Sequence, residues 1–424
     1  MKVLIIASIN SSNLGDKAIF LTMKKLFESH GHSVTGLDLN RRENRTSIGI
    51  GGCEHIITNG LYLNDKELLA ITQKDSKVSF KSLLKHVQPD FVRRLRVWHY
   101  TKKSYVRHKN EWTEIFKNHD VVVFGGGALL IDNLWNFPLA LLYASRLARK
   151  IEVPYGCVGC SVGETFSCSG GRWLKEFLAD CSFVTLRDSM SGISIRKLGV
   201  TEHMVYIDSA IRIGEIIKKE RDSAKGILGI NVLSYVLHPR ITRRGIRRYF
   251  NVLRRLIERI DKMPELGLRQ VVLFNTGETS DMRAALKLYD QVKSGLRNLG
   301  IKVCNKMQRL EDMCGVISQC DVVIGTRLHS SIIPKSYGIP IIGIDWDRKV
   351  SGFYEMIGLK EFCFDYETFD VEMIIDAIEK IKSNHFNQES GLEEQIGRFN
   401  ALPRYIFQKA GIAEDGATDK FENT

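Results

Sequence analysis

Short apolar runs alternate with stretches of helical periodicity along most of the chain. Residues 3–7 are all apolar, which is typical of a parallel strand that is buried on both faces. Apolar side chains then recur at helical spacing over residues 18–27, and a second strand is predicted over residues 32–39. This order predicts a β-α-β unit, whose crossover is expected to be right-handed.

The same alternation continues to residue 208 and starts again at residue 227. Further strands are predicted over residues 120–124, 153–158, 183–186, 205–208, 227–232, 270–274, 302–304, 321–324 and 339–344. Helices are predicted over residues 139–150, 188–198, 243–262, 280–299, 310–319, 350–358 and 370–383. A charged stretch, residues 215–225, separates the two series and is interpreted as a linker.

Two such series predict an α/β protein with two Rossmann-like parallel-sheet domains that face each other across a cleft. The chain has 424 residues, more than the roughly 250–300 at which a single hydrophobic core stops growing. The N-terminal domain is placed at residues 1–214 and the C-terminal domain at residues 226–385. Residues 386–424 are expected to form a terminal helix, around residues 391–409, and a tail, and to pack back on the N-terminal domain.

The composition favours anionic partners and a reducing compartment. Lys and Arg number 61 against 49 Asp and Glu, which gives a net charge of +12. Nine cysteines are too few in so long a chain for a disulfide framework. Cys157 and Cys160 lack further ligands at zinc-like spacing, so no metal site is predicted. No apolar stretch reaches the ~18 residues of a membrane span. We therefore expect a cytoplasmic protein that could also contact the inner face of the membrane peripherally.

Two stretches concentrate the positive charge. Residues 81–109 hold nine Lys and Arg against Asp90 alone, with Trp98 and two tyrosines interleaved. Residues 240–262 hold nine against two acids. A solvated helix face is one interpretation of each, and binding of an anionic lipid-linked glycan or membrane surface is another. Nucleic acid is the least favoured partner, because no nucleic-acid-binding motif is present.

The first half offers two candidate site segments. After the first strand, Asn13 and Asp16 flank Gly15, an arrangement that suits either ligand contact or helix capping. Gly125, Gly126 and Gly127 follow the strand at residues 120–124, where we expect a turn that could present N–H groups to an anion. A tight turn without a ligand is the alternative, since no GxGxxG spacing or Walker lysine is present.

Three cationic side chains and a histidine follow predicted strand ends. Arg187 precedes Asp188 at a helix start, Arg327 and His329 lie at another, and Lys349 begins a helix close by. Helix N-termini attract anions, and a planar guanidinium suits a carboxylate or phosphate. A histidine there can exchange a proton near neutral pH. Capped helices with internally paired side chains are the alternative. We predict one shared pocket, opposite the glycine turn, whose unpaired cations attract a dianion.

Together these segments resemble the polysaccharide pyruvyl transferase family. The resemblance spans residues 1–360, and its most specific part joins Arg327-Leu328-His329 to Gly338-x-Pro340 and Lys349-Val350-x-Gly352-Phe353. That family is similar in fold to the two-domain GT-B glycosyltransferases. Its members transfer pyruvate from phosphoenolpyruvate to sugar hydroxyls and usually form a cyclic ketal. The segment around Cys157 and Cys160 and the basic insert at residues 81–109 depart from the expected pattern.

The resemblance implies roles for the candidate residues. Phosphoenolpyruvate would be a donor substrate rather than a cofactor. The resemblance implies that the cations, the three glycines and the helix start bind it. These substrate-binding candidates are Arg187, Arg327, Lys349, Gly125, Gly126, Gly127 and Asn13. His329 is expected to act as general acid or to hydrogen-bond the phosphate. Asp16 is the weaker candidate, for deprotonating a sugar hydroxyl. The acceptor would be a sugar or a lipid-linked oligosaccharide.

Two alternatives remain open at this stage. The same histidine and arginine would serve a GT-B glycosyltransferase that uses a nucleotide sugar, because a diphosphate also needs them. A basic scaffold that binds anionic glycan or membrane without catalysis is the other. That alternative predicts no dependence on His329.

Overall fold

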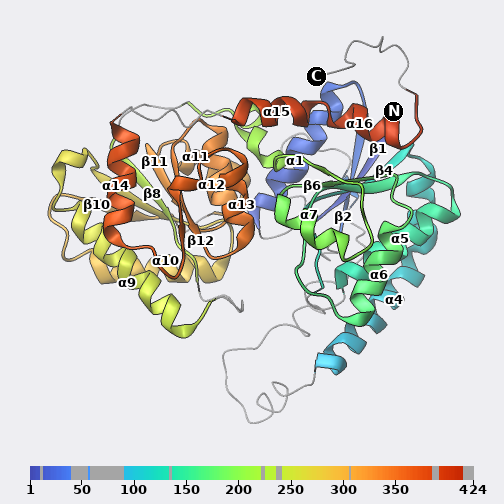
Figure 1. Cartoon of the computed structure of the whole chain (residues 1–424), viewed down its shortest axis with the longest axis horizontal. Coiled ribbons are helices and arrows are strands. Elements are labelled where there is room, and N and C mark those ends of the chain that lie inside the picture. Colours follow the sequence, from blue (N-terminus) through green and yellow to red (C-terminus); the bar gives the residue numbers. More distant parts are fainter. Residues whose placement is uncertain are drawn as a thin grey trace.

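The computed structural model of the chain describes residues 1–9, 13–39, 56–57, 90–132, 136–220, 225–234, 241–304, 307–383 and 391–413. Two separate parallel sheets form its centre, and helices cover both sheets (Figure 1). We call the part that contains the first sheet the N-terminal half and the part that contains the second the C-terminal half. Among the described residues, no helix is long and apolar enough to cross a membrane.

The first sheet has seven strands in the order β3-β2-β1-β4-β5-β6-β7. Its strands are β1 Lys2–Ala7, β2 Ser33–Asp38, β3 Ile56–Ile57, β4 Val121–Leu130, β5 Tyr155–Val162, β6 Phe183–Leu186 and β7 Met204–Val205. β1 pairs in parallel with β2 and β4, so the predicted β-α-β unit is present. All but the first residue of β1 are buried, as expected for a strand with helices on both faces.

The helices of the N-terminal half divide between the two faces of this sheet. They are α1 Leu14–Ser29, α4 Asp90–Lys117, α5 Asn136–Lys150, α6 Cys168–Leu178 and α7 Ser189–Arg196. Alternate residues of β1 belong to two different hydrophobic clusters, because successive side chains of a strand point to opposite faces. One cluster includes side chains of α4, α5 and α6, and the other includes those of α1.

The second sheet has six strands in the order β10-β9-β8-β11-β12-β13. Its strands are β8 Ile227–Asn231, β9 Gln270–Phe274, β10 Gly300–Val303, β11 Val322–Gly325, β12 Ile341–Asp345 and β13 Cys363–Asp365. The intervening elements are α9 Arg243–Ile260, η2 Pro264–Leu266, α10 Thr279–Val292, α11 Leu310–Ile317, α12 His329–Ser336, α13 Arg348–Met356, η3 Lys360–Phe362 and α14 Val371–Lys382. The two sheets confirm the predicted fold class.

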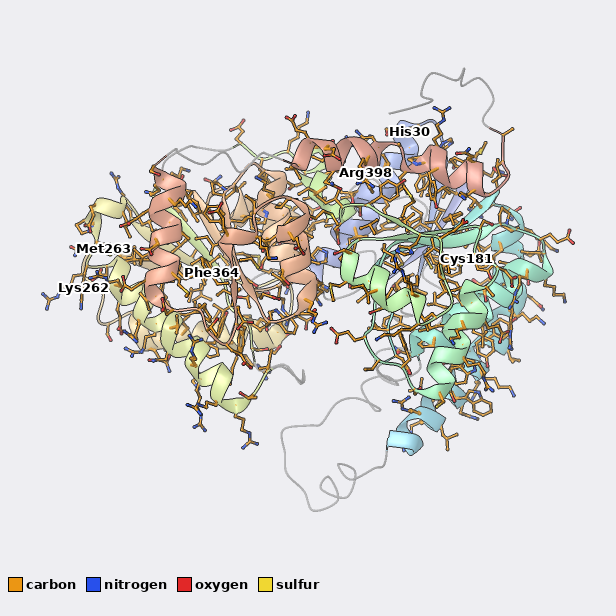
Figure 2. The ribbon with its side chains drawn as sticks, viewed as in Figure 1. His30, Cys181, Lys262, Met263, Phe364 and Arg398 are labelled. Atoms are coloured by element: carbon orange, nitrogen blue, oxygen red, sulfur yellow. The ribbon has the colours of Figure 1, made fainter. Side chains whose placement is uncertain are left out.

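Short elements and the terminal helices join the two halves. η1 Ser209–Arg212 and α8 Ile213–Ile216 follow the first sheet and contact both α1 and α12. One hydrophobic cluster therefore runs from α1 into the core of the C-terminal half. The terminal helices, α15 Leu392–Asn400 and α16 Leu402–Lys409, lie along the N-terminal half in Figure 1 and in Figure 2, which labels Arg398 of α15. There the ring of Phe407 contacts Phe27 and His32. The assignment of residues 1–214 and 226–385 to separate domains stays a prediction.

Two predicted local features are wrong. The chain does not turn at the three glycines: β4 continues through them to Leu130, because the apolar residues that follow keep pairing with β5. Gly126 and Gly127 have φ of +71° and +79°, and the register shifts between Gly127 and Leu130, so the glycines absorb a bulge in the strand. The single terminal helix predicted around residues 391–409 is instead two helices, which meet at Ala401.

Candidate functional site

The start of α1 is where the two halves meet most closely at the predicted site. The main-chain N–H of Leu14 donates to the carbonyl of Thr276, which follows β9, at 2.9 Å. A β-carbon on Gly15 would overlap the ring of His329. Glycine at position 15 therefore lets the histidine of the C-terminal half lie directly against the first turn of α1.

His329 bridges the two halves. It begins α12 immediately after β11, and its residue is 7% exposed. Its Nδ1 faces Gly15, and its Nε2 lies 3.6 Å from Oδ2 of Asp208, longer than an ordinary hydrogen bond. Among the described residues, Nε2 has no hydrogen-bond partner. A buried ring nitrogen without a partner is uncommon and calls for a reason.

Asp208 is a site residue that the sequence analysis missed. Its Oδ1 accepts from the N–H of Ala210 at 3.0 Å, and its Oδ2 accepts from Nη1 of Arg187 at 2.8 Å. Burial acts to raise the pKa of this carboxyl, but the His329 ring and the Arg187 guanidinium lower the pKa below its usual range. Asp208 is therefore a buried carboxylate next to the histidine. The available signal was its place as the last residue of the strand predicted over residues 205–208, because cleft residues of α/β proteins gather at the carboxyl ends of strands.

Arg187 is buried and bonded within the protein through two of its three guanidinium nitrogens. Its side chain is 4% exposed, and its Nε donates to Oγ of Ser161 at 2.7 Å. Burial acts to lower the pKa of this guanidinium, but Asp208 and Asp188 raise its pKa. Asp188 accepts from the hydroxyls of Ser161 and Ser191 at 3.0 and 2.9 Å. This network fixes Arg187 as the counter-ion of Asp208.

Asp16 and Gly127 lie beside this buried pair. A β-carbon on Gly127 would lie 3.3 Å from Oδ1 of Asp16, so the strand backbone comes close to that carboxylate. The charge of Asp16 also contributes to the raised pKa of Arg187. Four predicted site residues, namely Asp16, Gly127, Arg187 and His329, thus gather around Asp208 or its counter-ion.

Other predicted residues of the N-terminal half have structural roles. Oδ1 of Asn13 accepts from the N–H of Gly15 at 3.0 Å and caps α1. β-carbons on Gly125 and Gly126 would overlap Met23 and Ile19 of α1, so these glycines let the helix pack closely on β4. A binding role for these three residues stays a prediction.

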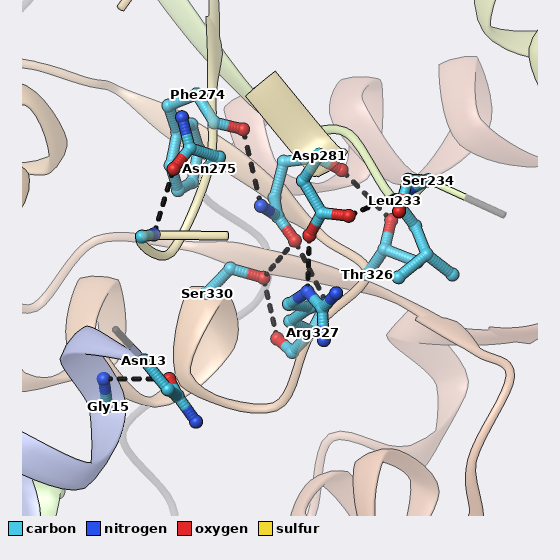
Figure 3. A network of polar contacts seen from close by, with 12 residues as sticks. Asn13, Gly15, Leu233, Ser234, Phe274, Asn275, Asp281, Thr326, Arg327 and Ser330 are labelled. Atoms are coloured by element: carbon cyan, nitrogen blue, oxygen red, sulfur yellow. Dashed lines mark hydrogen bonds and ion pairs between the residues drawn. The ribbon is translucent and has the colours of Figure 1, made fainter. Parts of the chain in front are cut away.

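Arg327 lies in a second polar network, shown in Figure 3. Its Nε donates to Oδ2 of Asp281, a carboxylate that is fully buried in the first turn of α10. Its main-chain N–H donates to Oδ1 of Asn231 at 3.0 Å, and the same oxygen accepts from the hydroxyl of Ser330 at 2.9 Å. Asp281 and Asn231 are further residues that the sequence analysis missed.

The outer edge of the Arg327 guanidinium has no hydrogen-bond partner among the residues that the structure describes. Its side chain is 23% exposed, and its two Nη atoms make no hydrogen bond to any described residue. The Oγ atom of Ser234 is also buried without a partner among the described residues. Ser234 donates its main-chain N–H to Asp281, so it belongs to the same network. The surroundings of Arg327 therefore hold unused hydrogen-bonding capacity.

Lys349 lies one strand further along the sheet, in the first turn of α13. Its Nζ is 2.9 Å from Oδ2 of Asp347 and 5.4 Å from the centre of the Trp346 ring. Nε1 of Trp346 donates to the carbonyl of Thr326 at 2.7 Å, which connects this strand end to that of Arg327. Lys349 thus neighbours the Arg327 network, and it has no ion pair or hydrogen bond with the His329 group among the described residues.

The predicted charge state of the site is wrong. We expected two arginines and a lysine that repel one another. The structure instead gives each cation a carboxylate: Arg187 has Asp208, Arg327 has Asp281 and Lys349 has Asp347. An incoming anion must therefore use the open edge of Arg327 or compete for Lys349, rather than neutralise a bare cationic cluster.

The cysteine pair is packed inside the sheet. Cys157 and Cys160 are buried free thiols on β5. Burial raises the pKa of Cys157, and its neighbour and burial together raise that of Cys160. Raised pKa values keep both groups as thiols and make them poor nucleophiles. Among the described residues, no group of three or more His, Cys, Asp or Glu side chains is placed to hold a metal ion.

Comparison with known proteins gives both sequence and fold relatives. The model of the polysaccharide pyruvyl transferase family matches residues 13–348. The amylovoran biosynthesis protein AmsJ of Erwinia amylovora is 23% identical over 429 residues, which cover 96% of this chain and 98% of that protein.

Among solved structures, the apo form of the lipopolysaccharide outer core galactosyltransferase WaaB matches with a TM-score of 0.50 at 13% identity. An alpha-glucosyltransferase in complex with UDP and a 13-mer DNA matches with the same TM-score at 9% identity. Each alignment covers 97% of this chain and 99% of the solved chain. At such low identity these two structures show the fold alone, which is that of GT-B glycosyltransferases.

Proposed function

The chain belongs to the polysaccharide pyruvyl transferase family, and from that premise we propose that it transfers pyruvate from phosphoenolpyruvate to hydroxyl groups of a sugar. The product would be a pyruvyl ketal on a polysaccharide or cell-surface glycan. The observation that best supports this function is the open guanidinium edge of Arg327 close to a buried His–Asp pair. An anion-binding edge and a proton-carrying group are the two elements that the reaction needs.

In this proposal the C-terminal half binds the donor. Phosphoenolpyruvate carries a phosphate and a carboxylate, and a planar guanidinium binds either with two parallel hydrogen bonds. The two free Nη atoms of Arg327 supply such an edge, and the start of α12 adds main-chain N–H groups. Lys349 can reach a second oxygen by leaving Asp347. Asp281 holds the guanidinium in place through Nε while the outer edge binds.

In this proposal the proton transfers take place at the interface between the two halves. Protonated His329 gives a proton to the methylene carbon of phosphoenolpyruvate, and an oxocarbenium-like centre forms at the neighbouring carbon. A sugar hydroxyl adds there and loses its proton to a carboxylate, for which Asp16 is the candidate. Phosphate then leaves, and a second hydroxyl closes the ketal with loss of its proton. The carboxylate of Asp208, whose Oδ2 lies 3.6 Å from Nε2, faces the ring and would hold its orientation during this transfer.

The burial of His329 sets a condition on this chemistry. Nε2 is enclosed between the two halves, so a donor reaches it only when α12 and α1 separate. Closure after binding would then exclude water from the oxocarbenium-like centre. Such opening would break the hydrogen bond from Leu14 to Thr276.

A cytoplasmic location belongs to the same proposal. Eight of the nine cysteines lie in the described residues, and all eight are free thiols. Persistent free thiols fit a reducing compartment. The acceptor would be a sugar or a lipid-linked oligosaccharide.

A nucleotide-sugar transferase is the second candidate, because the Arg327 edge and the start of α12 could equally hold a diphosphate. Thermal-shift measurements separate the two. A ligand that binds only the native state raises the melting temperature. We expect phosphoenolpyruvate to raise it and nucleotide sugars to leave it unchanged. A shift with a nucleotide sugar and none with phosphoenolpyruvate would replace the proposed donor.

A further inference from the structure

Helix α4 presents an exposed apolar stripe that the proposed reaction does not use. Leu95, Trp98 and Val106 are 52%, 37% and 66% exposed, and they are three of the seven large apolar side chains found exposed among the described residues. Their spacing, three residues and then eight, places them on one side of a helix. A row of apolar side chains on the outside of a helix is typical of a contact surface.

Other side chains of α4, mostly further along the helix, account for its packing. Val97, Trp112 and Phe116 are fully buried, and the ring of Tyr105 stacks on that of Tyr143 in α5 with 4.5 Å between centres. These side chains attach α4 to the N-terminal half. The exposed stripe is thus not required for folding of the helix onto the sheet.

Positive charge surrounds the stripe. Lys102, Lys103 and Arg107 are exposed beside it, and Nζ of Lys102 lies 5.1 Å above the ring of Trp98. Between Asp90 and Glu111 the sequence holds seven Lys and Arg and no acid. None of these three exposed cations has an ion-pair partner among the described residues. Their charges are therefore available to an external anion.

This combination differs from that of the other basic helix. Arg247 of α9 lies with Arg283 and Lys287 of α10 around a groove of about 520 Å³. Most large apolar side chains of α9, among them Tyr249 and Leu256, are buried in the core of its own half. Ile246 and Phe250 are half-buried and line the groove. The apolar side chains of α9 outside the core therefore lie inside a groove rather than along an exposed stripe, so charge alone does not single out α4.

We propose that the outer face of α4, defined by Leu95, Trp98, Lys102, Val106 and Arg107, binds the surface of an anionic lipid bilayer. A basic helix with a tryptophan and aliphatic side chains on its exposed side lies in the plane of a bilayer interface. Lys and Arg are attracted to the anionic headgroups. The inference does not rest on the proposed reaction. It would bring the enzyme to the place where a lipid-linked acceptor is found.

Vesicle sedimentation of the full-length chain tests this surface. We expect the chain to bind vesicles of phosphatidylcholine with 30 mol% phosphatidylglycerol about tenfold or more tightly than vesicles of phosphatidylcholine alone. The triple variant Lys102→Glu, Lys103→Glu, Arg107→Glu should lose binding at least tenfold. The matched control, Arg247→Glu, Arg283→Glu, Lys287→Glu, should change it less than threefold.

A second variant tests the apolar stripe. Trp98→Ser with Val106→Ser keeps every charge, and we expect it to weaken binding severalfold and to make the remaining binding fully reversible by salt. Each variant is checked for an unchanged melting temperature, because the substituted side chains are exposed. Loss of binding in the α9–α10 control equal to that in the α4 variant would overturn the assignment to α4. Absence of vesicle binding by the wild-type chain, or tight binding to duplex nucleic acid instead, would overturn the proposal itself.

Discussion

Arg187 of the N-terminal half and Arg327 of the C-terminal half follow strand ends in the same way, yet their surroundings differ. Arg187 is buried and uses Nε and Nη1 within the protein, on Ser161 and Asp208. Arg327 is partly exposed and uses Nε alone, on Asp281. The first guanidinium is thus committed to holding a carboxylate, whereas the second keeps an edge free for a ligand. An arginine at a strand end can bind a ligand only where the protein leaves some of its guanidinium nitrogens without a partner.

Breaking the buried pair should give the largest effect. Arg187→Gln keeps a donor at the position of Nε but removes the charge that faces Asp208. Loss of one partner from a buried ion pair costs about 3–5 kcal/mol, so the free energy of unfolding should fall by that amount in urea denaturation. Lys349→Gln is the control and should lose clearly less, since both members of the Lys349–Asp347 ion pair are partly exposed. Equal losses in the two variants would contradict the distinction.

The substitution His329→Ala should have the second-largest effect. A general acid contributes about 10²–10⁴-fold, so we expect kcat for pyruvate transfer to fall at least 10²-fold. Phosphate release from phosphoenolpyruvate in the presence of acceptor measures it. Phosphoenolpyruvate binding to the variant should persist, which separates a catalytic loss from a structural one. Near-wild-type turnover by His329→Ala would remove the histidine from the mechanism.

The pH dependence of stability tests Asp208 next. Its pKa is lower in the folded protein than in the unfolded chain, where it is about 3.9. The stabilisation from its charge is therefore complete above about pH 4 and is lost as the pH falls towards the folded pKa. The free energies of unfolding of wild type and Asp208→Asn should differ by a constant amount between pH 5 and 7. The difference should shrink below about pH 4. A difference that grows with acidification would mean that the carboxyl is not held ionised.

Lys349→Ala should have the smallest effect. Its partner Asp347 is partly exposed, and exposed ion pairs contribute about 0–1 kcal/mol. We expect a change in melting temperature close to the error of differential scanning fluorimetry. The KM for phosphoenolpyruvate should rise only severalfold, because Lys349 must first leave Asp347. A KM increase as large as that of an Arg327 variant would place Lys349 at the centre of donor binding.

The positions of most strands and the fold class could be predicted from the sequence, because buried parallel strands are continuous apolar runs. The sequence also placed His329 and Arg327 at a helix start. It could not reveal Asp208 as the partner of His329, since that contact forms only where the two halves pack. The three glycines were misinterpreted as a turn, because the pairing of β4 with β5 beyond Gly127 is a tertiary effect that overrides local flexibility.

The pairing of each cation was equally invisible in the sequence. Asp281 lies 46 residues before Arg327 and reaches it only because α10 begins beside the end of β11. Ordinary polar residues at strand ends and helix starts, such as Asn231 and Asp281, thus determine which cations stay available. Their positions can be predicted from the sequence, but their partners depend on the folded sheet.

Isothermal titration of phosphoenolpyruvate tests the distinction between the two arginines most directly. Arg327→Gln keeps a donor at the Nε position towards Asp281 and removes the free edge. Hydrogen bonds to a charged group contribute about 1.5–3 kcal/mol, so its Kd should rise about 10- to 10²-fold at a temperature where the variant is fully folded. Unchanged binding of phosphoenolpyruvate by Arg327→Gln would contradict the proposal that this open edge holds the donor.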